Sequence, residues 1–229
     1  MNQLFEIAAT YKLMLIEGIE ITIIMSILTI ILGLIFGIMM TFMKISRFKI
    51  LNLIANVYVE IIRGTPVLVQ IAIIFYGLPM MGIRIPEIML GDVDISRVVS
   101  GVVALTINTT AYICEIIRSG IESVDKGQLE ASRSIGFSAT ASMILIVLPQ
   151  AIKNILPAMG NEFITIIKTT SQVSIIGVAE LMYVADTIRG TTFKPMEPLI
   201  IVAIIYFVIT FTISVMIRIL ESRLKQSSI

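Results

Sequence analysis

Histidine is absent from this sequence of 229 residues, and cysteine occurs once. The lone Cys114 cannot form a disulfide within the chain, and no cluster of histidines and cysteines exists that would hold a metal ion. Charge is also scarce, since Asp, Glu, Lys and Arg make up 14% of the residues, against about 25% in an average soluble domain. A soluble protein of this size could not cover its surface with so few charges.

The net charge and the absence of one motif argue against two functional classes, nucleic-acid-binding proteins and nucleotide-hydrolysing enzymes. The net charge is only +1, so the chain lacks the basic excess typical of a nucleic-acid-binding protein. The sequence also contains no G-x-x-x-x-G-K-[ST] phosphate-binding loop. We therefore expect no nucleotide hydrolysis, no catalytic residues, no metal and no cofactor in this chain.

Apolar residues are abundant: 57% of the chain is hydrophobic and the mean hydropathy is +0.99. These values predict an integral membrane protein, all-α, with one domain over residues 1–229. A spanning helix takes about 20 residues, which leaves room for roughly five to seven spans. Charge-free stretches cover residues 21–43, 64–83, 98–114, 134–152 and 198–217, and a sixth stretch, 163–179, is interrupted only by Lys168.

The stretch at 134–152 is too polar in its first half to cross about 30 Å of hydrocarbon, so we expect five transmembrane helices. The positive-inside rule agrees. With five spans, ten basic residues lie inside and five lie outside, whereas six spans give eight against seven. The five outside are Lys12, Arg84, Arg97, Arg189 and Lys194. We predict that the N-terminal segment lies outside and forms an interfacial helix that leads into the first span. The C-terminus is predicted to lie in the cytoplasm.

The longest cytoplasmic connection, about residues 119–150, lies between spans three and four and has the pattern of a helix–turn–helix. A short helix over 128–135 is followed by Gly136, which can adopt the left-handed conformation that ends a helix. Ser138 can then cap a second short helix, which we expect to stop at Pro149. Such a unit would present a rigid knob to a cytoplasmic partner.

Glu130, Ala131, Ser132, Gly136, Leu148 and Pro149 stand at the spacing of a known loop. The pattern resembles the EAA loop of bacterial ABC-importer permeases, with Ser132 in place of the second alanine. The segments EIIRGTPVLVQ (60–70), NTTAYICEIIR (108–118) and NILPAMGNEF (154–163) resemble the polar amino-acid permease subfamily (histidine, glutamine and arginine permeases) in particular. The resemblance covers about residues 15–223.

The resemblance implies a permease subunit in the bacterial inner membrane whose EAA loop is a coupling helix seated in an ATPase subunit. Its partners would be two ABC ATPase subunits, which bind ATP and Mg, an extracytoplasmic solute-binding protein, and a second permease copy or a paralogue. The cargo would be a polar amino acid. Other cargoes, such as cystine or an opine, stay open, as does an ion-coupled secondary transporter, although no internal repeat or span-core Asp favours it.

Polar residues inside the spans are the candidates for the substrate pathway. Arg63, Gly64, Thr65 and Pro66 interrupt the second span, and Gly/Pro-interrupted helices point to transporter sites. The alternative is a plain kink in which Arg63 pairs with Glu60 or extends to the interface. Gln70 and Asn108 could line the pathway or join helices.

Lys168 lies in the fourth predicted span, where an unpaired charge costs on the order of 3 kcal/mol or more. We therefore expect Lys168 to face a cavity and, with Thr169 and Ser171, to receive the substrate's α-carboxylate. The alternative is an ion pair between Lys168 and Glu162 or Glu115. Relatives of this type often carry an acidic residue where this chain has Thr169, which disfavours a cationic cargo.

Overall fold

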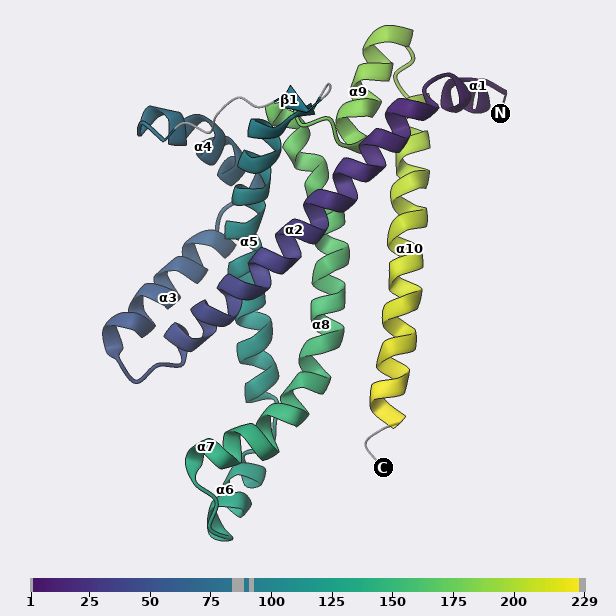
Figure 1. The fold of residues 1–229 in the computed structure, drawn as a ribbon. Coiled ribbons are helices and arrows are strands. Elements are labelled where there is room, and N and C mark those ends of the chain that lie inside the picture. Colours follow the sequence, from purple (N-terminus) through teal and green to yellow (C-terminus); the bar gives the residue numbers. More distant parts are fainter. Residues whose placement is uncertain (1, 84–88, 91–92, 227–229) are drawn as a thin grey trace.

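The computed structural model describes residues 2–83, 89–90 and 93–226. Its elements form an elongated, almost wholly helical bundle (Figure 1). Their bounds are α1 Asn2–Thr10, α2 Lys12–Lys44, α3 Lys49–Arg63, α4 Val67–Met80, β1 Met89–Leu90, β2 Val93–Asp94, α5 Ile95–Glu122, α6 Lys126–Ser134, α7 Ala139–Ser142, a π-helical turn Met143–Val147, α8 Leu148–Thr169, a 3₁₀ helix Thr170–Ile176, α9 Leu181–Thr192 and α10 Glu197–Gln226.

The all-α membrane architecture is confirmed, and the predicted count of five spans agrees with it. Within the described residues, four helical stretches are long and apolar enough to cross a membrane, and the bent pair α3–α4 makes a fifth when its two helices are counted as one span. The stretch at 134–152 is not a span of its own, because it contains α7, the π turn and the start of a helix that continues to Ile176. Arg84, one of the basic residues in the topology count, lies outside the described residues.

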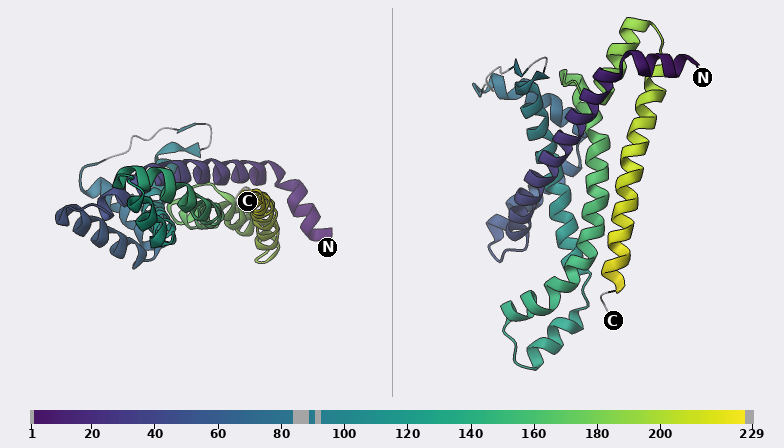
Figure 2. Two further views of the ribbon diagram at one scale, coloured as in Figure 1. Left: turned by 90° about the horizontal axis from the view of Figure 1, so that it is seen from below. Right: turned by 45° about the vertical axis from the view of Figure 1, so that its right-hand side comes forward.

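The two chain ends lie at opposite ends of the bundle (Figures 1 and 2). We call the end that carries α1, the β1–β2 pair and α9 the N-terminal end. The C-terminal end carries α6, α7 and the last turns of α10. Helix α1 is separate from α2, as predicted, and packs its Ile7 into a cluster with α9 and α10.

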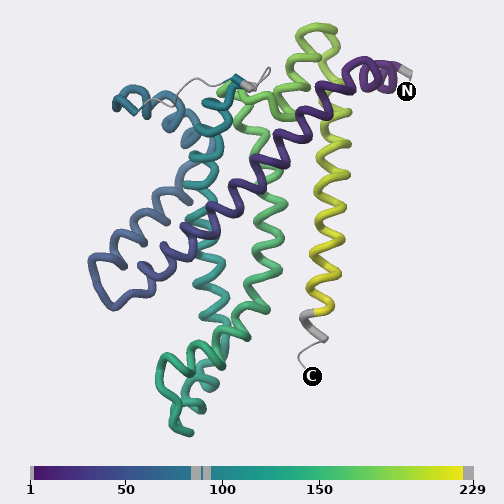
Figure 3. Tube along the Cα trace, viewed as in Figure 1, coloured from purple at the N-terminus to yellow at the C-terminus, as the bar shows by residue number. Residues whose placement is uncertain are grey.

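Helix α2 runs diagonally across the bundle (Figure 3). It packs against α5 from Met25 to Thr41. Small residues allow the two helices to approach closely, as is typical of helix packing in membranes. A Cβ at Gly33 would lie 2.6 Å from Thr109, and one at Gly37 would lie 2.5 Å from Ile113. This contact, together with α8 beside α5, forms the frame on which the polar residues are placed.

Helix α9 and the buried residue before it were not foreseen from the sequence. Glu180 is fully buried, and its carboxylate accepts hydrogen bonds from the backbone N–H groups of Met182 and Tyr183, each at 2.9 Å. The hydroxyl of Tyr206 on α10 donates a third, at 2.7 Å. Burial raises the pKa of the Glu180 carboxyl above its ordinary value. This carboxyl therefore caps α9 and ties it to α10.

Candidate functional site

The second span breaks at Gly64, Thr65 and Pro66, where α3 and α4 meet at 106°. Pro66 has no backbone N–H and stands at the N-cap of α4, so the helical hydrogen-bond ladder cannot run through it. Gly64 ends α3, and a Cβ there would lie 2.8 Å from the carbonyl oxygen of Glu60. The predicted interruption is present, and it is a sharp bend between two helices.

Gln70 satisfies the polar backbone groups that the break leaves open. Its side-chain Nε2 donates to the carbonyl oxygens of Ile62 (2.8 Å) and Thr65 (3.1 Å), and contacts the Thr65 hydroxyl at 2.8 Å. Its Oε1 accepts a hydrogen bond from Asn108 on α5, at 2.9 Å. Gln70 is therefore buried and fully engaged, and of its two predicted roles the structure supports the one of joining helices.

A cavity of about 240 Å³, which we call the break cavity, lies between the break, α5 and α8. Three of the predicted pathway residues, Thr65, Asn108 and Thr169, line it. The predicted residues Arg63, Gly64, Gln70, Lys168 and Ser171 do not. The other lining residues are Pro66, Val67, Leu105, Thr109, Tyr112, Glu162, Thr165 and Ile166.

Lys168 is exposed on the surface of this chain and does not line the break cavity, so the single subunit does not place it where the sequence predicts. Successive helical residues point about 100° apart, so Lys168 and its neighbour Thr169 face different directions. Among the described residues Lys168 forms no ion pair. Of its two suggested partners, Glu115 pairs with other cations and Glu162 lines the break cavity. The hydroxyl of Ser171 donates to the Lys168 carbonyl oxygen at 2.6 Å.

Glu162 is the residue of the break cavity that the sequence interpretation missed as a site. It is half-buried, and it forms neither an ion pair nor a hydrogen bond with any residue that the structure describes. Helical spacing could have found it, because Glu162, Thr165 and Thr169 are separated by three and four residues and so share one face of α8. That face points into the cavity.

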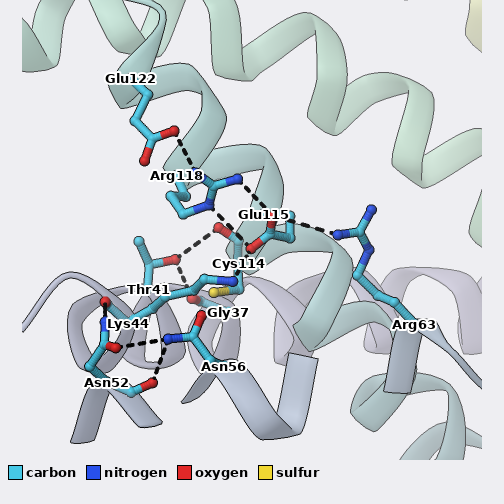
Figure 4. A network of polar contacts seen from close by, with 10 residues as sticks. All are labelled: Gly37, Thr41, Lys44, Asn52, Asn56, Arg63, Cys114, Glu115, Arg118 and Glu122. Atoms are coloured by element: carbon cyan, nitrogen blue, oxygen red, sulfur yellow. Dashed lines mark hydrogen bonds and ion pairs between the residues drawn. The ribbon is translucent and has the colours of Figure 1, made fainter. Parts of the chain in front are cut away.

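Glu115 on α5 is the centre of a second polar cluster, toward the C-terminal end (Figure 4). Its carboxylate contacts Lys44 of α2, Arg118 of α5 at 2.9 Å and Arg63 of α3 at 3.5 Å. We call these four residues the charge hub. Arg63 therefore pairs with Glu115, and its guanidinium also lies 5.6 Å from the centre of the Tyr112 ring. The pairing of Arg63 with Glu60, given above as the alternative to a pathway role, is not formed among the described residues.

A larger cavity of about 470 Å³ lies beside the hub, and we call it the hub cavity. Tyr112 and Glu162 line both cavities, so the two share a wall. The remaining lining residues are Arg63, Glu115, Ile116, Arg118, Ser119, Gly120, Ser123, Asn154 and Ala158. A polar route thus follows α5 and α8 from the break toward the C-terminal end.

The helix–turn–helix at the C-terminal end forms largely as predicted. Asp125 caps α6 by accepting a hydrogen bond from the N–H of Gly127, at 2.7 Å. Gly136 adopts the left-handed conformation, with φ of 97°, and the Ser138 hydroxyl accepts from the N–H of Ala141 at 3.2 Å. Glu130, Ala131 and Gly136 are exposed at this tip.

Two details of this unit differ from the predictions. Ser132 is buried and its hydroxyl lies 2.7 Å from that of Ser142, so this residue joins α6 to α7 and presents no surface. Pro149 does not stop the second helix. It follows closely after the π turn Met143–Val147, and the chain stays helical through Ala139–Ile176, so the wider turn accommodates the missing N–H. Leu148 is half-buried beside it, whereas Ile135 is 76% exposed at the tip.

Comparison with known proteins assigns the chain to a family. Residues 33–226 match the family described as "Binding-protein-dependent transport system inner membrane component". The chain is 37% identical to the probable glutamine ABC transporter permease protein GlnM of Bacillus subtilis (strain 168), over 93% of this chain and 94% of that protein. It is also 37% identical to the arginine transport system permease protein ArtQ of the same organism, over 93% of each chain.

A solved structure of the same shape has a related sequence. The crystal structure of an amino acid ABC transporter with histidines matches with a TM-score of 0.87 and 43% identity, covering 94% of this chain and 96% of that one. The MetNI methionine ABC transporter matches at 17% identity with a TM-score of 0.70, which shows a shared fold. The chain therefore belongs to the family of binding-protein-dependent transport system inner membrane components, the non-catalytic permease subunits of ABC transporters.

Proposed function

We propose that this chain is the permease subunit of an importer for a polar amino acid, driven by ATP hydrolysis in partner subunits. The observation that carries the proposal is the break cavity. There the polar side chains of Thr65, Asn108, Glu162 and Thr169 meet at a Gly/Pro break inside a membrane span, which is where transporters place their substrates.

The cavity has the chemistry needed to hold an α-amino acid. Glu162 supplies a carboxylate without a partner in the described chain, which suits the substrate's ammonium group. The Thr and Asn side chains offer donors for its carboxylate or a polar side chain. Because Glu162 is assigned to the ammonium group, Thr169 in place of an acidic residue still disfavours a cationic side chain. The glutamine and arginine permeases among the relatives support this class of cargo.

The exposed tip of the helix–turn–helix is the proposed contact with the ATPase. Glu130, Ala131 and Gly136 lie on its surface together with the apolar Ile135, while Ser132 and Ser142 fix its shape from inside. The partners would be two ABC ATPase subunits holding ATP and Mg, an extracytoplasmic solute-binding protein and a second permease copy or paralogue. The C-terminal end would face the cytoplasm and the N-terminal end the outside.

Transport would follow from alternating access. Closure of the ATPases on ATP would draw the two tips together, and α3 and α4 would move about their break, exposing the cavity first outside and then inside. The substrate must bind the two states with different affinity, because a ligand with equal affinity for both shifts nothing.

Uptake of labelled amino acids by the reconstituted complex tests the cargo. Proteoliposomes containing the permease, its ATPase and its binding protein should import glutamine or arginine, and Glu162→Gln should lower the uptake at least tenfold while assembly and basal ATP hydrolysis persist. Uptake of cystine or an opine alone would change the cargo. Normal uptake by Glu162→Gln would remove this residue from the site.

The coupling role has its own test. Glu130→Lys reverses a charge at the tip, and Gly136→Val places a β-branched residue at a φ that strongly disfavours it. Both variants should insert but lose ATP hydrolysis stimulated by the binding protein, or lose the ATPase subunit. Glu221→Lys is the matched control, a charge reversal at the same end but on α10. If both loop variants import at normal rates, the tip is not the coupling surface.

A further inference from the structure

The hub cavity lies next to the break cavity and shares Tyr112 and Glu162 with it. It is about 470 Å³ in volume, against about 240 Å³ for the break cavity. An amino acid that fits the break cavity therefore also has room in the hub cavity. It extends along α5 to Gly120 and Ser123, toward the helix–turn–helix. A substrate that leaves the break cavity in this direction therefore enters the hub cavity.

Arg63 is the least engaged cation in the hub. Lys44 and Arg118 both hold the Glu115 carboxylate closely, whereas Arg63 reaches it only at 3.5 Å. A guanidinium has five N–H donors, yet Arg63 donates no hydrogen bond to any residue in the described part of the chain. Its side chain is 44% exposed, and one face of the guanidinium lies over the Tyr112 ring.

The opposite charge in the same cavity is Glu162. Because Glu115 is already neutralised by Lys44 and Arg118, Arg63 and Glu162 remain as a cation and an anion with donors and acceptors to spare. That pattern complements a zwitterion, whose carboxylate would bind the planar guanidinium in a two-point contact. We propose that the hub cavity is a second amino-acid site, in which Arg63 receives the substrate carboxylate while Glu162 keeps the ammonium group.

This inference rests on the proposed function, and it gives the route a physical sequence of steps. Glu162 lines both cavities, so the ammonium group can stay on one partner while the carboxylate moves from the polar residues of the break cavity to Arg63. The charged carboxylate then exchanges one set of donors for another, which avoids the large penalty of an unpaired charge in a low-dielectric region. Arg63 also adjoins the break, so movement there moves this site.

Cysteine protection separates the two sites. In a Cys114→Ala background, Thr165→Cys places a thiol in the break cavity and Ser119→Cys places one in the hub cavity. The purified permease–ATPase complex in detergent is reacted with a small thiol reagent, with and without saturating L-glutamine, and then L-arginine as a second probe. We expect the probe that the complex imports to slow the labelling of each cysteine, by about twofold if it divides its time equally, because the two sites share Glu162 and are occupied in turn.

The proposal is decided by Arg63 variants. Arg63→Gln should abolish protection of Ser119→Cys and leave protection of Thr165→Cys intact, Arg63→Lys should retain part of it, and Arg218→Gln on α10 should change neither. If Thr165→Cys is protected but Ser119→Cys is not, or if Arg63→Gln leaves the protection of Ser119→Cys unchanged, the second site is wrong and the proposed function stands. If neither probe protects Thr165→Cys, the break-cavity site fails and the second site fails with it.

Discussion

The two ends of the bundle hold a carboxylate in opposite ways. At the C-terminal end, Glu115 is held by the cations of three helices, Lys44, Arg63 and Arg118. At the N-terminal end, Glu180 is fully buried and is held by neutral donors, the N–H groups of Met182 and Tyr183 and the hydroxyl of Tyr206.

The two ends also differ in their apolar packing, which is more extensive toward the N-terminal end. Two clusters of eight buried residues each, centred on residues such as Leu181 and Leu105, lie toward the N-terminal end. The cluster between α3 and α5 has only three buried members, Val59, Ala111 and Cys114. Close packing and directional cap bonds favour one arrangement, whereas ion pairs act over longer distances and can exchange partners. The comparison teaches that the N-terminal end is held mainly by close apolar packing and cap bonds, and the C-terminal end mainly by ion pairs.

The largest expected effect concerns which end faces which side of the membrane. In a Cys114→Ala background, Phe193→Cys at the N-terminal end should react in whole cells with an impermeant thiol reagent, because Phe193 is 90% exposed. Ser222→Cys, near the end of α10, should react only after the cells are permeabilised. The expected difference is all or none, measured by mass shift. Labelling of Ser222→Cys in intact cells would invert the proposed orientation.

The next effect is on the charge hub. Glu115→Gln removes the anion that Lys44 and Arg118 share inside a membrane span, and breaking such a pair on one side costs on the order of 3 kcal/mol. The melting temperature of the purified complex should fall by several degrees. Glu122→Gln is the matched control, since Glu122 pairs with Arg118 but its side chain is 62% exposed, so its loss should cost about 0.5 kcal/mol. Equal effects of the two variants would contradict the hub.

At the N-terminal end, Glu180→Gln should cost about 1–2 kcal/mol by disturbing the acceptor for three donors. The pH dependence of this stability loss shows whether it comes from the ionisable carboxyl. Burial raises the pKa of Glu180 from 4.5, so the folded state binds the proton more tightly and stability falls as pH rises from about 4.5 through the raised pKa. The melting-temperature difference between the wild type and the variant should therefore be larger at low pH. Parallel pH profiles would contradict a buried, titrating Glu180.

The smallest effect is expected at the surface of the N-terminal end. Asp94 caps α5 and pairs with Arg97 at 2.9 Å, and its pKa is lowered, chiefly by the hydrogen bond from Ser96. Its contribution is present above the ordinary pKa of 3.8 and is lost as pH falls through the lowered value. Asp94→Asn should cost about 0.5 kcal/mol or less at neutral pH, measured as a melting-temperature shift. A larger loss would mean that the exposed Asp94–Arg97 pair contributes substantially to the stability of this end.

Much of the architecture was predictable because it depends on local chemistry. A helix that must span lipid needs about 20 apolar residues, so charge-free runs predicted the spans. Gly136 and Ser138 act through backbone conformation and capping within a few residues, so the helix–turn–helix was also predicted. Pro149 was misjudged, because a proline in a helix interior usually ends the helix, whereas here the π turn just before it lets the helix continue.

The sequence by itself determined the membrane-spanning helices, the break at Gly64–Pro66 and the exposed tip with Glu130, since each follows from composition or from neighbours along the chain. Only the tertiary structure decided which polar residues meet. Lys168 was an outlier in hydropathy yet faces away from the cavities, while Glu162, Arg63 and Glu115 come together from α8, α3 and α5. The rotation of each helix about its axis places these side chains, and packing between distant segments such as α2 and α5 sets that rotation.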